Sequence, residues 1–160
     1  MTRSLFMVDS VAQRPAALQY PPRRTDPSLT ASESYTYNAH MTDQVALQPV
    51  EYAHAIIDSA SELQAYDLVL LDVRQACDFA DYFVILSAQS PRQVRSLIEE
   101  IESLMTAQGA RLHHLEGTHE SGWVLMDFGD VIVHILSPDE REFYDLERVW
   151  PKAVELVRLQ

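Results

Sequence analysis

Five aspartates are the side chains of this chain best suited to chemistry. Near the ends of apolar runs lie Asp72, Asp78, Asp81, Asp127 and Asp130. At such positions a nucleotide-handling enzyme could hold magnesium through carboxylate oxygens. Aspartate is also common in turns and at the ends of regular elements, because its side chain bonds nearby backbone amides. We favour this local role over a metal site.

The other candidate reactive residues form no recognisable motif. His113 and His114 are adjacent and would point to opposite faces of a strand, and no HExxH or other paired histidine spacing occurs. The chain has four glycines, too few for a P-loop or a dinucleotide fingerprint. The single cysteine, Cys77, and the serines lack a nucleophile motif. The sequence therefore predicts no enzyme, cofactor or metal site.

The net charge of −12 is unevenly distributed along the chain. Residues 1–49 contain four arginines and four acidic residues, so the whole net charge lies in residues 50–160. An acidic domain repels a phosphate backbone, so direct nucleic-acid binding is disfavoured. A basic protein is the partner that this charge favours.

Composition divides the chain in two. Residues 1–45 contain four of the eight prolines, a Ser/Thr-rich patch and no sustained hydrophobic period, which predicts a disordered leader. A tail that folds on a partner is the alternative. Residues 46–157 look like one folded domain. One cysteine excludes an internal disulfide framework, and no apolar run approaches a membrane span, so we expect a cytoplasmic protein.

Periodicity predicts the elements of the first half of this domain. A helix begins near Pro49 and ends near Ala65, and strands follow at 67–73 and 82–88. Ser90 is the predicted N-cap of a long helix, with Pro91 at its first position, and Gly109 is well placed to end it. A weaker strand is predicted over 111–117.

The second half is organised around a hairpin, 123–136, that turns at Gly129 and Asp130. One face of this ribbon is wholly apolar. The other face is mixed, with Trp123 beside Leu136 and Leu125 beside His134. Sheets of this class commonly bury both faces, so a covering by the same chain competes with a covering by another protein.

Two helices are predicted after the hairpin. The first begins at Pro138 and ends at Tyr144, and the second is capped by Asp145, spans 146–157 and is interrupted at Pro151. The order of elements indicates an α/β domain with a mixed five-stranded sheet flanked by helices.

Several separated motifs resemble the ribosomal silencing factor, or Iojap-like, family. They are DYFVILSAQSPRQV at 81–94, LEG at 115–117, WVLMDFGDVIVHIL at 123–136 and REFYDLERVW at 141–150. The family usually has Gly where this chain has Ala88, and often His where it has Gln93. The second difference puts in doubt any polar contact by that side chain.

The resemblance implies a nucleotidyltransferase-like fold without catalytic residues, and it implies a partner. That partner is the fourteenth protein of the large ribosomal subunit, a basic protein on the inter-subunit face. Family members that occupy it prevent the small subunit from joining and so repress translation, notably under starvation. They often form homodimers when free. Homodimerisation and ribosome binding could then compete for one apolar face.

We hypothesise that the mixed face of the hairpin docks on this partner. The predicted apolar and aromatic contacts are Trp123, Leu125, His134 and Leu136. Glu140 and Glu142 are predicted to supply a polar rim. Two other functions stay open: a nucleotidyltransferase-like magnesium enzyme using Asp72, Asp81 or Asp127, and an assembly factor for the large subunit.

Overall fold

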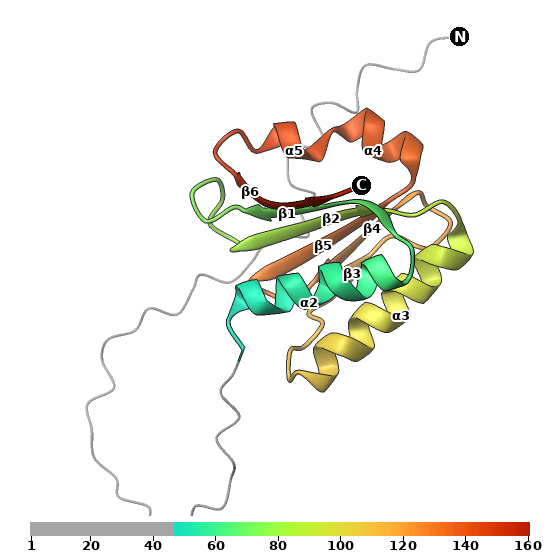
Figure 1. Ribbon diagram of the computed structural model, residues 1–160, viewed down its shortest axis with the longest axis horizontal. Coiled ribbons are helices and arrows are strands. Elements are labelled where there is room, and N and C mark those ends of the chain that lie inside the picture. The colour runs from blue at the N-terminus through green and yellow to red at the C-terminus, as the bar shows by residue number, and fades with distance from the viewer. Residues whose placement is uncertain (1–46) are drawn as a thin grey trace, which may run out of the picture. The chain divides into compact units, whose positions relative to one another are not determined.

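A computed structural model describes residues 47–160 of the chain, and the predicted leader, 1–45, lies outside the described residues. The described residues lie in one compact unit. Figure 1 shows a sheet with two long helices on one face and two short helices on the other. The predicted α/β class is confirmed.

The described part of the chain contains four helices and six strands. The helices are α2 (Pro49–Glu62), α3 (Pro91–Ala107), α4 (Pro138–Tyr144) and α5 (Leu146–Val149). The strands are β1 (Tyr66–Asp72), β2 (Tyr82–Ser87), β3 (His114–Glu116), β4 (Trp123–Asp127), β5 (Val131–Leu136) and β6 (Val154–Leu159).

The sheet is mixed, in the order β3-β4-β5-β2-β1-β6. The central pair, β2 and β5, is parallel, and the other neighbouring pairs are antiparallel. Parallel strands need a long crossover connection, and here it contains α3, β3 and β4. The edges of the sheet are therefore the short β3 and the longer β6.

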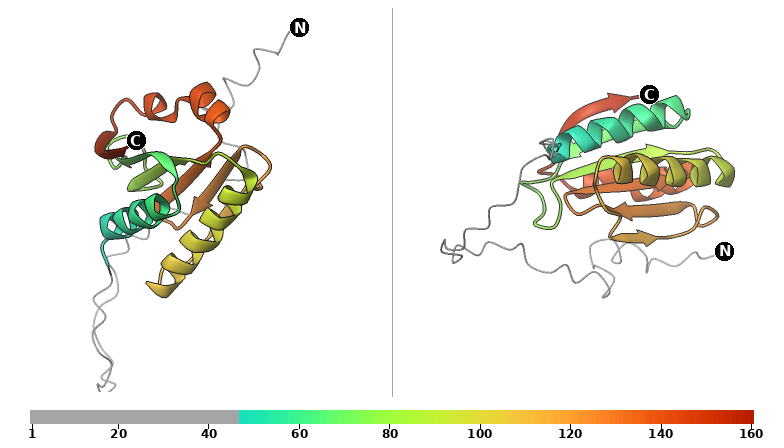
Figure 2. Two further views of the ribbon diagram at one scale, coloured as in Figure 1. Left: turned by 45° about the vertical axis from the view of Figure 1, so that its right-hand side comes forward. Right: turned by 90° about the horizontal axis from the view of Figure 1, so that it is seen from below.

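The apolar face of the hairpin forms the main core with α2 and α3 (Figure 2). The hairpin contributes Val124, Met126, Phe128, Val131, Val133 and Ile135. From α3 come Val94, Leu97, Ile101 and Met105, which recur at helical spacing. This packing leaves the mixed face of the hairpin directed towards α4 and α5.

The hairpin register is the predicted one. Trp123 pairs with Leu136 and Leu125 pairs with His134. Gly129 adopts a φ of +90°, a left-handed conformation that a residue with a Cβ rarely adopts. A glycine at this turn thus fixes which side chains share a face.

The prediction of a helix over the whole of 146–157 is wrong. The helix stops early, and a sixth strand follows where five were predicted in the sheet. α5 ends at Val149, just before Pro151, and β6 follows to Leu159, two residues beyond the predicted domain end. Proline cannot continue a helix, and Val154 and Val157 favour a strand. A bulge at Leu156, which has no partner in β1, disrupts the two-residue alternation that would have indicated the strand.

The start of α3 follows the prediction and adds one long-range contact. The Ser90 hydroxyl accepts a hydrogen bond from the Gln93 amide at 3.2 Å. The Gln93 side chain donates to the carbonyls of Leu63 at 3.1 Å and Gln64 at 2.9 Å, just after α2. Gln93 therefore makes the polar contact that its departure from the family pattern put in doubt.

Candidate protein-binding face

Trp123 and His134 are joined across the β4–β5 pair on the face directed towards α4. The indole Nε1 of Trp123 donates to Nδ1 of His134 at 3.3 Å, and the ring centroids are 5.9 Å apart. The ring of Phe83, on β2, meets His134 edge-on at 5.3 Å. His134 is therefore a packed interior residue that orients the indole.

The surroundings of His134 keep its imidazole neutral at pH 7. Only 7% of the residue is exposed. Burial, together with the positive charge of Arg141, lowers the pKa of His134 from 6.5 to about 4. A neutral imidazole has one nitrogen free to accept a hydrogen bond, and the Trp123 indole uses it.

The six predicted contact residues fall into three groups. Leu136 (0% exposed) and His134 are buried inside the domain, so in this conformation they support the face instead of forming it. Trp123 and Leu125 are half-buried on β4 and accessible to a partner. The two glutamates lie on α4, where Glu142 is exposed and Glu140 is half-buried.

The two glutamates lie on opposite flanks of α4. An ideal Cβ on Gly122, next to Trp123, would be 3.0 Å from Cγ of Glu140. Glu142 instead lines a groove on the β1 side of the helix with Asp67 and Glu147. Glu140 therefore belongs beside Trp123, whereas Glu142 does not.

Two aromatic residues of α4 complete the surface. The Tyr144 ring lies 4.6 Å from the Trp123 ring between centroids, and Phe143 packs edge-on against Tyr144 at 5.0 Å. Phe143 is 62% exposed, the most exposed of the large apolar side chains in the described region. Here "the Trp123 face" means Trp123, Leu125, Glu140, Phe143 and Tyr144.

Sequence reasoning placed Phe143 and Tyr144 on a helix but missed their part in this face. The available signal was the pair of aromatic residues in a short helix that is otherwise mostly charged. Amphipathic spacing cannot be judged over seven residues, so only the packing of α4 on β5 reveals which flank meets Trp123.

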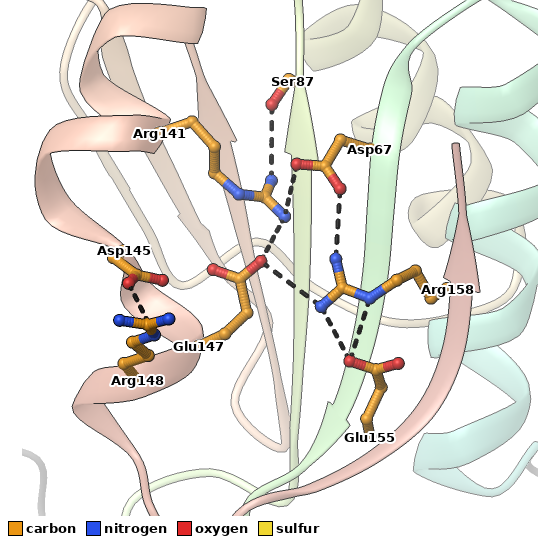
Figure 3. A network of polar contacts seen from close by, with 8 residues as sticks. All are labelled: Asp67, Ser87, Arg141, Asp145, Glu147, Arg148, Glu155 and Arg158. Atoms are coloured by element: carbon orange, nitrogen blue, oxygen red, sulfur yellow. Dashed lines mark hydrogen bonds and ion pairs between the residues drawn. The ribbon is translucent and has the colours of Figure 1, made fainter.

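A buried arginine holds α4 in place. Arg141, 7% exposed, donates to the Glu147 carboxylate at 2.6 Å and to the Ser87 hydroxyl at 3.4 Å, and it lies 3.5 Å from Asp67. Figure 3 shows the network continuing to Arg158 on β6. Buried charges persist only where they are paired, so this network fixes α4 over the sheet.

The groove beside this network is acidic. Its volume is about 400 Å³, and its lining includes four carboxylates, those of Asp67, Glu142, Asp145 and Glu147. Arg141 also lines the groove, and its guanidinium already pairs with Asp67 and Glu147. The open side of the groove suits a basic side chain.

Two of the aspartates considered for magnesium, Asp72 and Asp127, make local contacts. The Asp72 carboxylate pairs with the guanidinium of Arg74, which lowers the pKa of Asp72. Asp127 accepts a hydrogen bond from the Gly129 amide at 2.7 Å, within the hairpin turn. Within residues 47–160 no group of three or more His, Cys, Asp or Glu side chains is arranged to hold a metal ion. In the same range, no helix has the length and apolar character of a membrane span.

Comparisons with known proteins agree with one another. The family model described as "Ribosomal silencing factor during starvation" matches residues 46–160. A ribosomal silencing factor of Halalkalibacterium halodurans is 33% identical over 103 residues, covering 64% of this chain and 88% of the relative.

Two further matches extend this result. A crystal structure of a protein from Chromobacterium violaceum has a TM-score of 0.61 and 28% identity, covering 65% of this chain and 87% of that one. A mouse protein named "Mitochondrial assembly of ribosomal large subunit protein 1" is 29% identical over 89 residues, 54% of this chain and 39% of the relative. By the extent of the family match, the chain belongs to the ribosomal silencing factor family.

Proposed function

We propose that this protein binds the large ribosomal subunit, sterically blocks its joining with the small subunit and so represses translation, especially under nutrient limitation. Family membership supports the silencing role. The single observation that carries the binding site is the Trp123 face, where half-buried and exposed aromatic rings lie beside the carboxylate of Glu140 on an acidic domain.

The chemistry of this face is that of a protein-binding surface. Aromatic residues such as Trp and Tyr supply much of the binding energy at interface centres, because they bury large areas with few rotatable bonds. Trp123 is already oriented by His134, and Tyr144 packs against it, so little side-chain freedom is lost on binding.

The proposed partner is the fourteenth protein of the large subunit, as the family resemblance implies. A basic protein complements the domain charge, and Glu140 supplies a carboxylate beside the aromatic rings. Glu142 and the acidic groove can engage basic side chains on the other flank of α4. We also propose that the protein acts in the cytoplasm.

The experiment compares two tryptophan variants. Trp123→Ala removes the centre of the Trp123 face. Trp150→Ala is the matched control, because Trp150 packs against Phe79 and Phe83 at centroid distances of 5.9 and 5.5 Å instead of contributing to that face. Each protein is tested for thermal unfolding, for co-sedimentation with purified large subunits and for inhibition of subunit joining.

We expect Trp123→Ala to weaken large-subunit binding by at least about 30-fold, the equivalent of about 2 kcal/mol at an interface centre. Folded Trp150→Ala should bind normally even where its melting temperature falls. Unchanged binding by folded Trp123→Ala would remove the Trp123 face from the proposal. Tight binding of the wild type with no effect on subunit joining would remove the silencing mechanism.

A second candidate is a role in assembly of the large subunit, which the name of the mouse relative favours. Both functions use a large-subunit surface, so binding alone does not separate them. Depletion of the protein does: loss of a silencing factor raises the fraction of joined ribosomes in starved cells, whereas loss of an assembly factor leaves incomplete large subunits in growing cells.

A further inference from the structure

The position of α4 determines whether the Trp123 face is assembled. This helix carries three of the five residues of the face, Glu140, Phe143 and Tyr144. On one flank the Tyr144 ring meets the Trp123 ring, with centroids 4.6 Å apart. Among the residues of α4, Arg141 alone is buried. A short helix that buries so little apolar surface needs other tertiary contacts to hold it.

Two carboxylates link α4 to the last strand of the sheet (Figure 3). The guanidinium of Arg141, on α4, lies 2.6 Å from Glu147 and 3.5 Å from Asp67. The guanidinium of Arg158, on β6, lies 3.3 Å from Asp67 and 3.8 Å from Glu147. Each carboxylate therefore lies between two positive charges, one from the helix and one from the strand.

Asp67 reaches this network through a bulge in β1. The register between β1 and β2 shifts by one residue between Tyr66 and Val69, so two residues of β1 lie opposite one residue of β2. Asp67 has a φ of +48°, a left-handed conformation that Asp and Asn tolerate better than other side chains. In a regular strand Asp67 would lie on the opposite face from Tyr66, but here both line the groove beside α4. The bulge thus directs the carboxylate to the two arginines.

We propose that Asp67 and Arg158 are positioning residues for the Trp123 face. Through Arg141 and Glu147 they hold α4 in the orientation that binds the partner. This inference rests on the proposed function of that face. In the sheet, β5, β2 and β1 lie between β4 and β6, so Arg158 acts on the face from a remote strand. Binding residues need such support, because small displacements of a contact surface cost affinity.

The charge of Arg158 makes its effect diagnostic. The proposed partner is basic, so loss of a positive charge from the acidic domain should by itself strengthen the attraction. Positioning predicts the opposite result. Without Arg158, Asp67 and Glu147 each keep only their contact with Arg141, and α4 is held less firmly. A fall in affinity on removal of Arg158 therefore identifies positioning.

The first experiment compares two variants of β6 in the full-length protein, by thermal unfolding and by co-sedimentation with purified large subunits. Arg158→Ala should lower the affinity about five- to tenfold, the size of effect that contact networks carry. Glu155→Ala is the matched control on the same strand. It removes the 2.7 Å ion pair with Arg158 but leaves the contacts of Arg158 with Asp67 and Glu147, so it should bind normally.

The second experiment tests whether Asp67 and Arg158 act together. Asp67→Asn removes the negative charge but keeps a side chain that tolerates the positive φ of the bulge. This variant should lower the affinity to a similar extent as Arg158→Ala. The double variant should bind little more weakly than either single variant, because both substitutions break the same contact. Losses that add in the double variant would overturn the shared role.

Trp123 fluorescence reports the position of α4 in the absence of ribosomes. The chain has two tryptophans, so Trp150→Phe leaves Trp123 as the only one that emits. Tyr144 packs against the Trp123 ring, and a displaced α4 would expose that ring to water. In the Trp150→Phe protein, Arg158→Ala should therefore shift the emission to longer wavelength, whereas Glu155→Ala should leave it unchanged.

The two readouts decide the proposal together. Unchanged or tighter large-subunit binding by folded Arg158→Ala overturns it, and so does unchanged Trp123 emission. If Arg158→Ala does not fold, Arg158→Gln takes its place, because glutamine keeps part of the aliphatic stem on β6. A wild type that does not bind large subunits would remove the proposed function. The emission measurement contains no ribosomes, so it would still show whether Arg158 positions α4.

Discussion

The Trp123 indole and the His134 imidazole form one unit, in which an interior residue holds a surface residue at 3.3 Å from Nε1 to Nδ1. Both residues belong to the mixed face of the hairpin, yet only the tryptophan is accessible. This contact explains how a histidine is retained inside an apolar core, because the lone pair on its Nδ1 accepts a hydrogen bond from the indole N–H. It also divides the predicted contacts into those that are accessible to a partner and those that support them.

Acid should destabilise the domain through His134. In the unfolded chain the His134 imidazole takes up a proton near pH 6.5. In the folded domain, burial and the charge of Arg141 lower the pKa of His134 to about 4. Between these values the unfolded state binds more protons, so stability falls as the pH drops from about 6.5 to about 4 and then levels off. The loss is at most about 3 kcal/mol. Urea unfolding at a series of pH values measures it.

His134→Asn is the control for this prediction. The amide oxygen of asparagine can accept from the Trp123 indole but does not titrate. The variant should lose this part of the pH dependence, while carboxylate titration remains in both proteins. If the free energy of unfolding depends on pH in the same way in the variant and the wild type, His134 is not the cause of the acid destabilisation.

Arg141→Ala should be strongly destabilising. The guanidinium is buried and pairs with Glu147 at 2.6 Å, so its removal leaves the Glu147 carboxylate without its closest positive charge and leaves Asp67 with Arg158 but without Arg141. Breaking a buried pair in this way costs about 3–5 kcal/mol. Denaturant unfolding gives the value directly.

Arg148→Ala is the matched control on the neighbouring helix. Its side chain is 88% exposed and, among residues 47–160, forms an ion pair with Asp145 alone, so its loss should cost no more than about 0.5 kcal/mol. Equal effects of the two substitutions would argue against the Arg141 network as the element that fixes α4.

Gly117→Ala should destabilise the turn that leads into β4. A Cβ at Gly117 would lie within 2.2 Å of the Trp123 carbonyl oxygen, and the residue has a φ of +88°. Gly109→Ala separates the two effects, because Gly109 has a similar φ of +83° but open space around its Cβ position. Gly109→Ala should cost about 1 kcal/mol and Gly117→Ala clearly more, as measured by thermal unfolding.

Phe143→Ala should weaken binding to the large subunit while leaving the fold intact. The side chain is 62% exposed, so its truncation should change stability by no more than about 0.5 kcal/mol. In the Trp123 face it should lower affinity about tenfold, as an aromatic contact near the interface centre. Leu115→Ala, an exposed apolar residue on β3, is the control in the same co-sedimentation assay and should bind normally.

Much of the fold could be predicted from the sequence, because local patterns carry it. Ser90 and Pro91 mark the start of α3 through bonds that span three residues. Gly129 sets the hairpin turn, and the turn sets the register, so the pairing of Trp123 with Leu136 follows from neighbouring residues alone. The motifs that indicate the family lie within these same segments.

The tertiary structure alone decided which residues are accessible. Alternation places Trp123 and Leu125 on the same face as His134 and Leu136, but it cannot say that α4 and its neighbours cover the second pair and leave the first accessible. That outcome depends on Arg141 meeting Glu147 and Asp67, residues brought together by folding.

The same reason explains the missed strand. β6 is stabilised by pairing with β1, more than eighty residues earlier in the sequence, and its bulge removes the local period that would have indicated it. Sequence by itself determined the turns, caps and apolar faces of this protein, since those depend on short-range geometry. The Trp123 face and the edge strand β6 depend on long-range packing, and only the folded chain defines them.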